Sequence, residues 1–229
     1  MTKLFFSRHL DVCFSLVPFT QSSTTACQIA KMTVSRRDII GLAGIGLLSA
    51  TPLLARPSSR ATRLVSAARK QIGVTTVYSQ AYHGISYPNG DFPRNSGACT
   101  DVIVRAYRDG LDLDLQKLIH LDMKKAFSAY PKIWGLKTTD RSIDHRRVPN
   151  MRKFFQRQGA VQPFSKEPHD WLPGDLVTSI IGGKLAHCGI VSDRKKGDRP
   201  LLIHNVGRGT REEDRLFAWP ITGHYRWAV

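Results

Sequence analysis

The order of secondary-structure patterns along the chain constrains its fold more than any other feature. Apolar residues recur at helical spacing in four segments between Ala61 and Gly159, whereas short apolar runs separated by Gly, Pro and charged residues follow Trp171. The first pattern predicts helices and the second predicts strands. Because the helices come first and the strands afterwards, the sequence predicts an α+β fold in which N-terminal helices pack on a C-terminal antiparallel sheet.

The expected helices cover Ala61 to Ile72, Cys99 to Tyr107, Leu113 to Tyr130, and a fourth segment bracketed by Pro149 and Gly159. The expected strands cover Asp175 to Ile181, His187 to Val191, Leu201 to His204, and His224 to Val229. Residues 74–97 are rich in Tyr, Pro and Gly. This composition predicts a long surface loop of the kind that often lines a site.

The first 55 residues differ in character from the rest of the chain. Ser35-Arg36-Arg37-Asp38-Ile39-Ile40 is followed at once by an apolar segment from Gly41 to Leu54. This order is typical of a twin-arginine export signal, and the segment is shorter than the roughly 20 residues that span a bilayer. We therefore expect a mis-assigned or disordered extension at 1–31, a signal peptide at 32–55 and one folded domain at 56–229.

The chain is strongly basic, with a formal net charge of +16 that lies mostly on residues 56–229. Such a charge favours anionic partners, namely nucleic acid, lipid headgroups or the acidic polymers of a cell wall, although a merely solvated basic face is the alternative. The sequence shows neither zinc-finger spacing nor an aromatic-basic strand typical of RNA-binding domains. We therefore expect no nucleic-acid partner. No transmembrane helix is expected in the mature form.

Cys99 is the first candidate for chemistry. Gly97 and Ala98 precede it, which places its thiol in the first turn of a helix, where N–H groups and the helix dipole favour a thiolate. The apolar stripe of that helix begins at Val102, so the sulfur should face the sheet. The alternative is an inert core cysteine, since cysteine is often buried.

Cys188 is the only other cysteine in residues 56–229. A disulfide to Cys99 is therefore a competing structural role for both residues. Neighbouring residues of a strand point to opposite faces. If His187 faces Cys99, we expect Cys188 to point away, which disfavours the disulfide.

Three motifs in the second half of the chain accompany Cys99: Trp171-Leu-Pro-Gly-Asp-Leu-Val177, His187-Cys-Gly-Ile-Val191 and Leu202-Ile-His-Asn205. In this order they resemble the NlpC-type superfamily of papain-like cell-wall cysteine peptidases. The resemblance implies that Cys99 is the nucleophile, His187 the general base and His204 the residue that orients it. Ala98 departs from the pattern, because an aspartate commonly precedes the cysteine. Thr100-Asp101 likewise replaces a small Ser-Gly pair.

At finer grain, the chain from about Ala61 to its end resembles the domain of unknown function 1287 family. The matching segments are Cys99-Thr-Asp-Val-Ile-Val-Arg-Ala-Tyr107, Ile143-Asp-His-Arg-Arg-Val-Pro-Asn150, the Pro-Gly-Asp segment at 173–175, the His-Cys-Gly-Ile-Val-Ser-Asp segment at 187–193, and Ile221-Thr-Gly-His-Tyr-Arg226. This second resemblance names no reaction.

Asp101, His145 and Arg146 are weaker candidates for binding a substrate carboxylate, because arginine suits that geometry. Structural roles are the alternative: His145 as a helix cap and Arg147 in an internal salt bridge. Residues near the C-terminus are expected at the surface or in loop closure: Glu212, Glu213, Asp214 and His224.

Together, these features predict an exported cysteine hydrolase of the periplasm or cell envelope. It would need no cofactor and would act on amide bonds of peptidoglycan stem peptides. Its partner would be peptidoglycan or another anionic envelope polymer. Two alternatives belong to other classes. One is a metal site built from His187, His204 and either Asp193 or a cysteine, although this spacing matches no recognised ligand set. The other is a non-catalytic envelope-binding protein.

Overall fold

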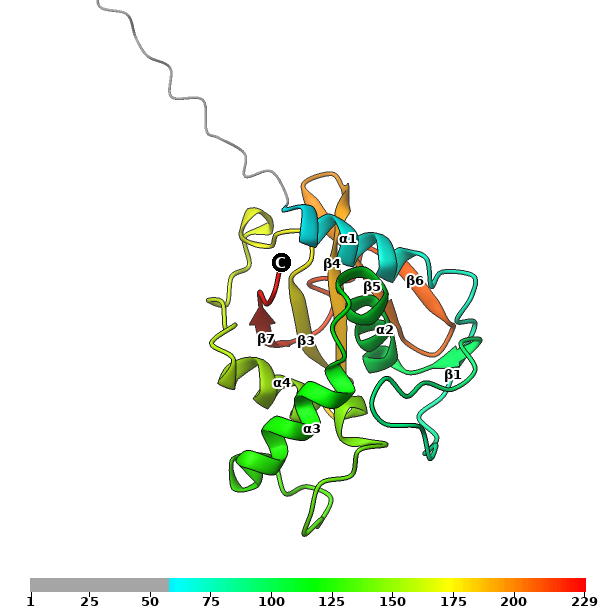
Figure 1. Ribbon diagram of the computed structural model, residues 1–229. Helices are drawn as coiled ribbons and strands as arrows, with labels where there is room; N and C mark the ends of the chain where they lie inside the picture. Colours follow the sequence, from blue (N-terminus) through cyan, green and yellow to red (C-terminus); the bar gives the residue numbers. More distant parts are fainter. Residues whose placement is uncertain (1–57) are drawn as a thin grey trace, which may run out of the picture. The chain divides into compact units, whose positions relative to one another are not determined.

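The computed structural model describes residues 58–229 as an α+β domain (Figure 1). Its helices are α1 (Ser59–Arg69), α2 (Cys99–Leu111), α3 (Leu115–Lys125) and α4 (Val148–Arg157), with short 3₁₀ turns η1 (Phe127–Ala129), η2 (Asp144–Arg146) and η3 (Pro168–Asp170). Its strands are β1 (Val77–Tyr78), β2 (Ser96–Gly97), β3 (Leu176–Ile181), β4 (Leu185–Lys196), β5 (Arg199–Asn205), β6 (Thr210–Glu213) and β7 (Ile221–Tyr225). The predicted extension and export signal lie outside the described residues.

The main sheet has the strand order β6-β5-β4-β3-β7, and every neighbouring pair is antiparallel. The predicted α+β class with an antiparallel C-terminal sheet is therefore confirmed. Strand β6 was not predicted, because its sequence Thr-Arg-Glu-Glu contains no apolar residue. It forms at an edge of the sheet, where only one neighbour supplies hydrogen bonds and side chains face solvent.

The helix boundaries shift from the expected ones for local reasons. Helix α1 begins after Ser58, whose hydroxyl accepts a hydrogen bond of 3.0 Å from the Ala61 N–H, and it ends at Arg69 instead of Ile72. Helix α2 continues past Tyr107 until Asp112, which adopts a left-handed conformation with φ of 57°. Such a residue closes a helix. The third expected helix divides into α3 and the separate turn η1.

The core between the helices and the sheet is rich in aromatic side chains. Phe155 of α4 is 1% exposed and packs 5.7 Å from both Tyr225 and Trp227, measured between ring centroids. Tyr107 of α2 joins this group. The opposite face of the sheet carries a smaller core around Trp171. Both faces of the sheet are thus covered, and residues of β3, β4 and β5 alternate between the two cores.

Residues 74–97, predicted to be a surface loop, are attached to the helices by buried polar side chains. Arg105 of α2 is 1% exposed and bonds the Asp91 carboxylate at 2.9 Å and the Ser96 carbonyl at 3.0 Å. Gln116 of α3 accepts from the Gly90 N–H at 2.8 Å. These bonds satisfy buried loop groups and hold the segment against the start of α2.

Phe155→Ala should lower the free energy of unfolding by about 3–5 kcal/mol, because it removes a fully buried ring and leaves a cavity. Phe164→Ala is the matched control. Its ring is 68% exposed, so a change of less than about 0.5 kcal/mol is expected. Urea denaturation followed by circular dichroism measures both variants. If both variants lost the same free energy of unfolding, Phe155 would not be part of the buried core.

Candidate active site

Cys99 is the first residue of α2 and is 4% exposed. The carboxylate of Asp101 accepts a hydrogen bond of 2.6 Å from the Ala98 N–H, and so caps the start of the helix. The sulfur therefore lies in a first helical turn, as the sequence predicted. Unpartnered N–H groups and the helix dipole stabilise negative charge there.

Asp101 and Arg146, two of the residues predicted to bind substrate, form a buried ion pair with each other. Arg146 Nε and Nη2 donate to the two carboxylate oxygens at 2.8 and 2.9 Å. Its Nη1 donates to the Ala81 carbonyl at 2.6 Å. Because all three nitrogens bond groups within the fold, this geometry favours a role in holding the start of α2 over direct contact with substrate.

His145, the third predicted substrate-binding residue, is 3% exposed. Burial, and then the charges of Arg146 and Arg108, lower the pKa of His145 to about 3, so the ring is neutral at physiological pH. The helix cap that was its alternative role is not formed, because the N-cap of α4 is Arg147 and receives no side-chain bond. The buried position favours a structural role.

Two side chains of β4 interact with the Cys99 sulfur. Hydrogen bonds with the Cys188 thiol and with the His187 ring lower the pKa of Cys99 well below its ordinary range, although burial acts in the opposite direction. Burial and the neighbouring Cys99 raise the pKa of Cys188 well above its ordinary range. Cys99 is thus the thiol that ionises, with Cys188 as a protonated donor. Both are free cysteines.

The expectation that Cys188 points away from Cys99 is wrong. Cys188 packs with Ile190 and Cys99 in the core on the helix side of the sheet. His187 lies on the opposite face, the face of Val191, because side chains of a strand alternate. Alternation sets the face of each side chain but not its distance from the end of a neighbouring helix, and both side chains lower the pKa of Cys99.

Gly189 separates His187 and Val191 on their common face. A Cβ added there would lie 2.8 Å from Leu202 Cγ and 3.0 Å from the Ile203 carbonyl oxygen. Only glycine permits so close an approach of β5 to β4. In the motif His-x-Gly-Ile-Val, the glycine allows β4 and β5 to pack closely. Ile190 and Val191 then pack into the cores on the two opposite faces of the sheet.

His187 Nε2 and His204 Nδ1 lie 2.8 Å apart and form a buried hydrogen bond. Burial, and then the charges of His187 and Arg215, lower the pKa of His204 to about 3, so this ring is neutral and carries one N–H. Its other nitrogen, Nε2, lies 3.5 Å from the carboxylate of Glu213, which favours the proton on that side. His204 Nδ1 then accepts from His187 Nε2–H. His187 Nδ1 is left to exchange a proton with the thiol.

Two residues beside the histidine pair were not assigned a role from the sequence. Trp219 packs edge-on against His187 at 5.4 Å between centroids and tilts against His204 at 5.9 Å. Glu213, expected at the surface or in a loop, has a side chain that is 32% exposed and faces His204. Neither position has a sequence signal, because both lie in segments without a clear periodic pattern.

Cys99 borders a cleft of about 540 Å³. Apolar and basic side chains line this cleft: Ile133, Trp134, Ile180, Arg146, Arg147, Arg152 and Lys184. Arg147 pairs with Asp144 at 3.2 Å and lies over the Trp134 ring at 4.2 Å, so it contributes to both the fold and the cleft. A concave site of this size suits a small peptide, and its basic lining favours a ligand with negative charge.

Tyr78 and Gln80 are further neighbours of Cys99 that the sequence did not single out. The parallel pairing of β1 and β2 aligns Tyr78 with Gly97, two residues before the cysteine. Burial, and then the nearby Cys99, raise the pKa of Tyr78 to about 12. The Gln80 amide donates to the Tyr78 hydroxyl at 2.5 Å, and Gln80 also lines the Cys99 cleft.

The structure does not support the alternative metal site. Within residues 58–229, no three His, Cys, Asp or Glu side chains are grouped so that they could hold a metal ion. Asp193, one of the ligands considered, instead pairs with Arg69 of α1. No helix of the described domain is long and apolar enough to cross a membrane.

His224, a further buried histidine, has a structural explanation. His224 Nε2 bonds Asp175 at 2.8 Å, its Nδ1 lies 3.1 Å from the Pro163 carbonyl, and Trp171 stacks on the ring at 3.8 Å. Arg226 binds both oxygens of the same aspartate at 2.7 and 2.8 Å. Because its polar atoms are partnered, this cluster joins β7 to the Trp171–Asp175 segment. His224 was expected either at the surface or in loop closure, and its buried contacts agree with loop closure.

The fold and the Cys99–His187–His204 cluster define an α+β domain with a candidate cysteine-based active site. The chain belongs to the family described as "Domain of unknown function (DUF1287)", which it matches over residues 65–227. It is 48% identical over 167 residues to uncharacterized protein YijF of Escherichia coli (strain K12), a match that covers 72% of this chain and 81% of that protein. No solved structure matches. The predicted membership of the family is confirmed.

We expect iodoacetamide to alkylate Cys99 much faster than Cys188 at neutral pH, because the pKa of Cys99 is lowered well below its ordinary range and that of Cys188 is raised well above it. His187→Ala removes a hydrogen bond that lowers the pKa of Cys99, so the rate profile should move to higher pH. Peptide mass spectrometry after timed exposure measures the rates. Cys188→Ser is the control and should keep the fast reaction. Coincident profiles for native protein and His187→Ala would rule out the His187 contact.

The two buried neutral histidines predict destabilisation by acid. The pKa values of His145 and His204 are lowered from 6.5 to about 3, so between these values the unfolded chain binds more protons than the folded chain. The free energy of unfolding should therefore fall as pH drops through this window. His145→Gln should flatten the dependence, measured by urea denaturation across pH. His169→Gln, at an exposed position, should leave it unchanged. If the free energy of unfolding of His145→Gln depended on pH as steeply as that of the native protein, His145 would not be a buried neutral ring.

Proposed function

We propose that this protein is a cysteine hydrolase of the cell envelope that cleaves amide bonds in peptidoglycan stem peptides. Three observations carry the proposal: Cys99 opens α2, the neighbouring His187 and Cys188 lower the pKa of its thiol, and His187 forms a buried hydrogen bond of 2.8 Å with His204. An ionised thiol, an imidazole bonded to it and a second group that orients the imidazole are the parts of nucleophilic catalysis by cysteine. The cleft beside Cys99 provides space for substrate.

In the first half-reaction, His187 takes the proton of Cys99 and the thiolate attacks the carbonyl carbon of the amide. The carbonyl oxygen becomes an oxyanion. The N–H groups at the start of α2 and the Gln80 amide are the candidate donors to it, and such a donor is worth roughly 3 kcal/mol in known cases. His187 then protonates the leaving nitrogen, the C–N bond breaks, and a thioester forms on Cys99.

In the second half-reaction, His187 removes a proton from a water molecule that attacks the thioester carbonyl. The C–S bond breaks, the thiol is restored, and a carboxylic acid leaves. His204 touches no reacting atom in this scheme. It positions His187 by accepting its Nε2–H, which leaves Nδ1 as the nitrogen that exchanges a proton with the thiol.

The same proposal includes the papain-like, NlpC-type assignment. It is supported by a cysteine that opens a helix, a histidine on β4 and a third polar residue on β5, in the order that this superfamily uses. The departure at position 101 has a local reason, because the Asp101 carboxylate caps α2 and binds Arg146.

Envelope localisation is also part of the proposal and rests on the twin-arginine pattern at 32–55 and on the basic charge. An excess of lysine and arginine raises the local concentration of anionic polymers such as a cell wall. An exported hydrolase with a basic cleft would meet this substrate outside the cytoplasm.

The test is release of soluble fragments from purified cell walls, measured by liquid chromatography and mass spectrometry. Cys99→Ala should abolish release while the circular dichroism spectrum is unchanged, and His187→Ala should lower the rate by about 10²–10⁴. Cys188→Ser is the matched control, since the serine hydroxyl can still donate to Cys99 and the nucleophile is kept, and it should retain turnover. Undiminished release by Cys99→Ala would end the proposal. Wall binding without release by the native protein would favour the non-catalytic alternative.

A further inference from the structure

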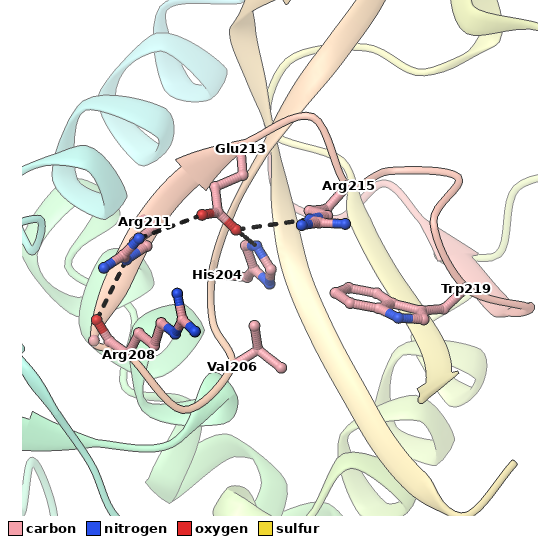
Figure 2. A pocket seen from close by; sticks show the side chains of 8 residues that line it. His204, Val206, Arg208, Arg211, Glu213, Arg215 and Trp219 are labelled. Carbon is pink, nitrogen blue, oxygen red and sulfur yellow. Dashed lines mark hydrogen bonds and ion pairs between the residues drawn. The ribbon is translucent and has the colours of Figure 1, made fainter. Parts of the chain in front are cut away.

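A second pocket, of about 270 Å³, lies at the hairpin of β5 and β6. Figure 2 shows Arg208, Arg211 and Arg215 around it, with Glu213 beside His204 and Trp219 along one side. None of its lining residues belongs to the Cys99 cleft. His204 is thus bonded to His187 through one nitrogen and borders this separate pocket.

The charges of the pocket are unbalanced. Three arginines and one glutamate line it, and His204 is neutral. The Glu213 carboxylate lies 3.7 Å from Arg211 and 3.9 Å from Arg215, well beyond the roughly 2.7–2.9 Å of a charge-assisted hydrogen bond. The guanidinium groups therefore keep donors for a further anion.

His204 contributes a buried polar atom that has no hydrogen-bond partner among residues 58–229. The residue is 1% exposed, and no group of the described domain forms a hydrogen bond with its Nε2. Glu213, at 3.5 Å, is too distant for a good bond. A buried N–H without an acceptor costs about 1–3 kcal/mol, and an acceptor atom of a bound ligand would remove that cost.

The loop that forms the pocket is fixed in place. Asn205 donates to the Gly97 carbonyl at 2.8 Å, and the Thr210 N–H donates to the Thr75 carbonyl at 2.7 Å. Gly209 has φ of +79°, and a Cβ there would lie 2.6 Å from the Thr75 oxygen. The loop thus rests against residues 75–97 and needs little ordering when a ligand binds.

We propose that this pocket binds the carboxylate group of a ligand. Arg208 and Arg215 hold its oxygens, His204 Nε2–H donates to one of them, and the Trp219 ring packs against the attached carbon chain. A singly charged carboxylate matches the forked donors of arginine. A phosphate dianion would meet stronger repulsion from Glu213, which lines the same space.

Occupancy has a consequence for the active site, and this consequence rests on the proposed function. A ligand acceptor at Nε2 holds the proton of His204 on that nitrogen and fixes the ring, so His204 Nδ1 is presented to His187 in the orientation that catalysis requires. The pocket would thus act as a subsite that orients the histidine pair when a carboxylate is bound.

Titration of the purified full chain with triglycine and triglycine amide, followed by calorimetry, tests the binding. We expect triglycine to bind and the amide to bind at least tenfold more weakly. Arg208→Ala and Arg215→Ala should each weaken triglycine binding about tenfold or more. Arg63→Ala removes an equal charge at an exposed position of α1 and should bind normally. Titration with succinate tests whether an organic acid without a peptide backbone also binds.

Equal binding of triglycine and its amide, or tighter binding of inorganic phosphate, would overturn the carboxylate assignment. Absence of binding by both triglycine and succinate would overturn the site itself. Cys99→Ala should bind triglycine as the native protein does. This variant lacks the proposed nucleophile, so triglycine binding by it tests the pocket independently of cell-wall cleavage.

Discussion

The buried pair of Asp101 and Arg146 holds the start of α2, and the candidate active site depends on that position. Asp101 caps the helix through the Ala98 N–H, while Arg146 reaches from η2 to the Ala81 carbonyl. Three segments distant in sequence therefore meet at the turn that carries Cys99. A buried charge left without its partner typically costs about 3–5 kcal/mol, so the pair constrains where the sulfur lies even if its net contribution to stability is small.

The two faces of the sheet carry different parts of the site. Cys188 lies on the helix side with Cys99, whereas His187 and His204 lie on the other side beneath Trp219. Cys188 and His187 of β4 nevertheless both lower the pKa of Cys99, although their side chains leave the strand in opposite directions. His204 borders the arginine-lined pocket, whereas Cys99 borders the other cleft.

Much of the fold was predictable because its determinants are local. Helical spacing and turn residues predicted four helices, and alternating apolar runs predicted four strands of the sheet. Strand β6 was not predicted, because its sequence Thr-Arg-Glu-Glu contains no apolar residue. Within the site, Cys99, His187 and His204 were identified by motif. Asp101, Arg146 and His145 were chosen for their chemistry alone. The burial of all three and the ion pair between Asp101 and Arg146 depend on how distant segments pack.

By itself, the sequence determined the α+β class, the helix-opening position of Cys99 and the two histidines on neighbouring strands. These follow from periodicity, capping and short motifs, which act over a few residues. The tertiary structure alone decided that Cys188 faces Cys99, that Tyr78 and Gln80 reach the cleft, and that Trp219 and three arginines surround His204. These contacts join segments far apart in the chain, and the distances between them depend on how helices and strands pack, which no local pattern encodes.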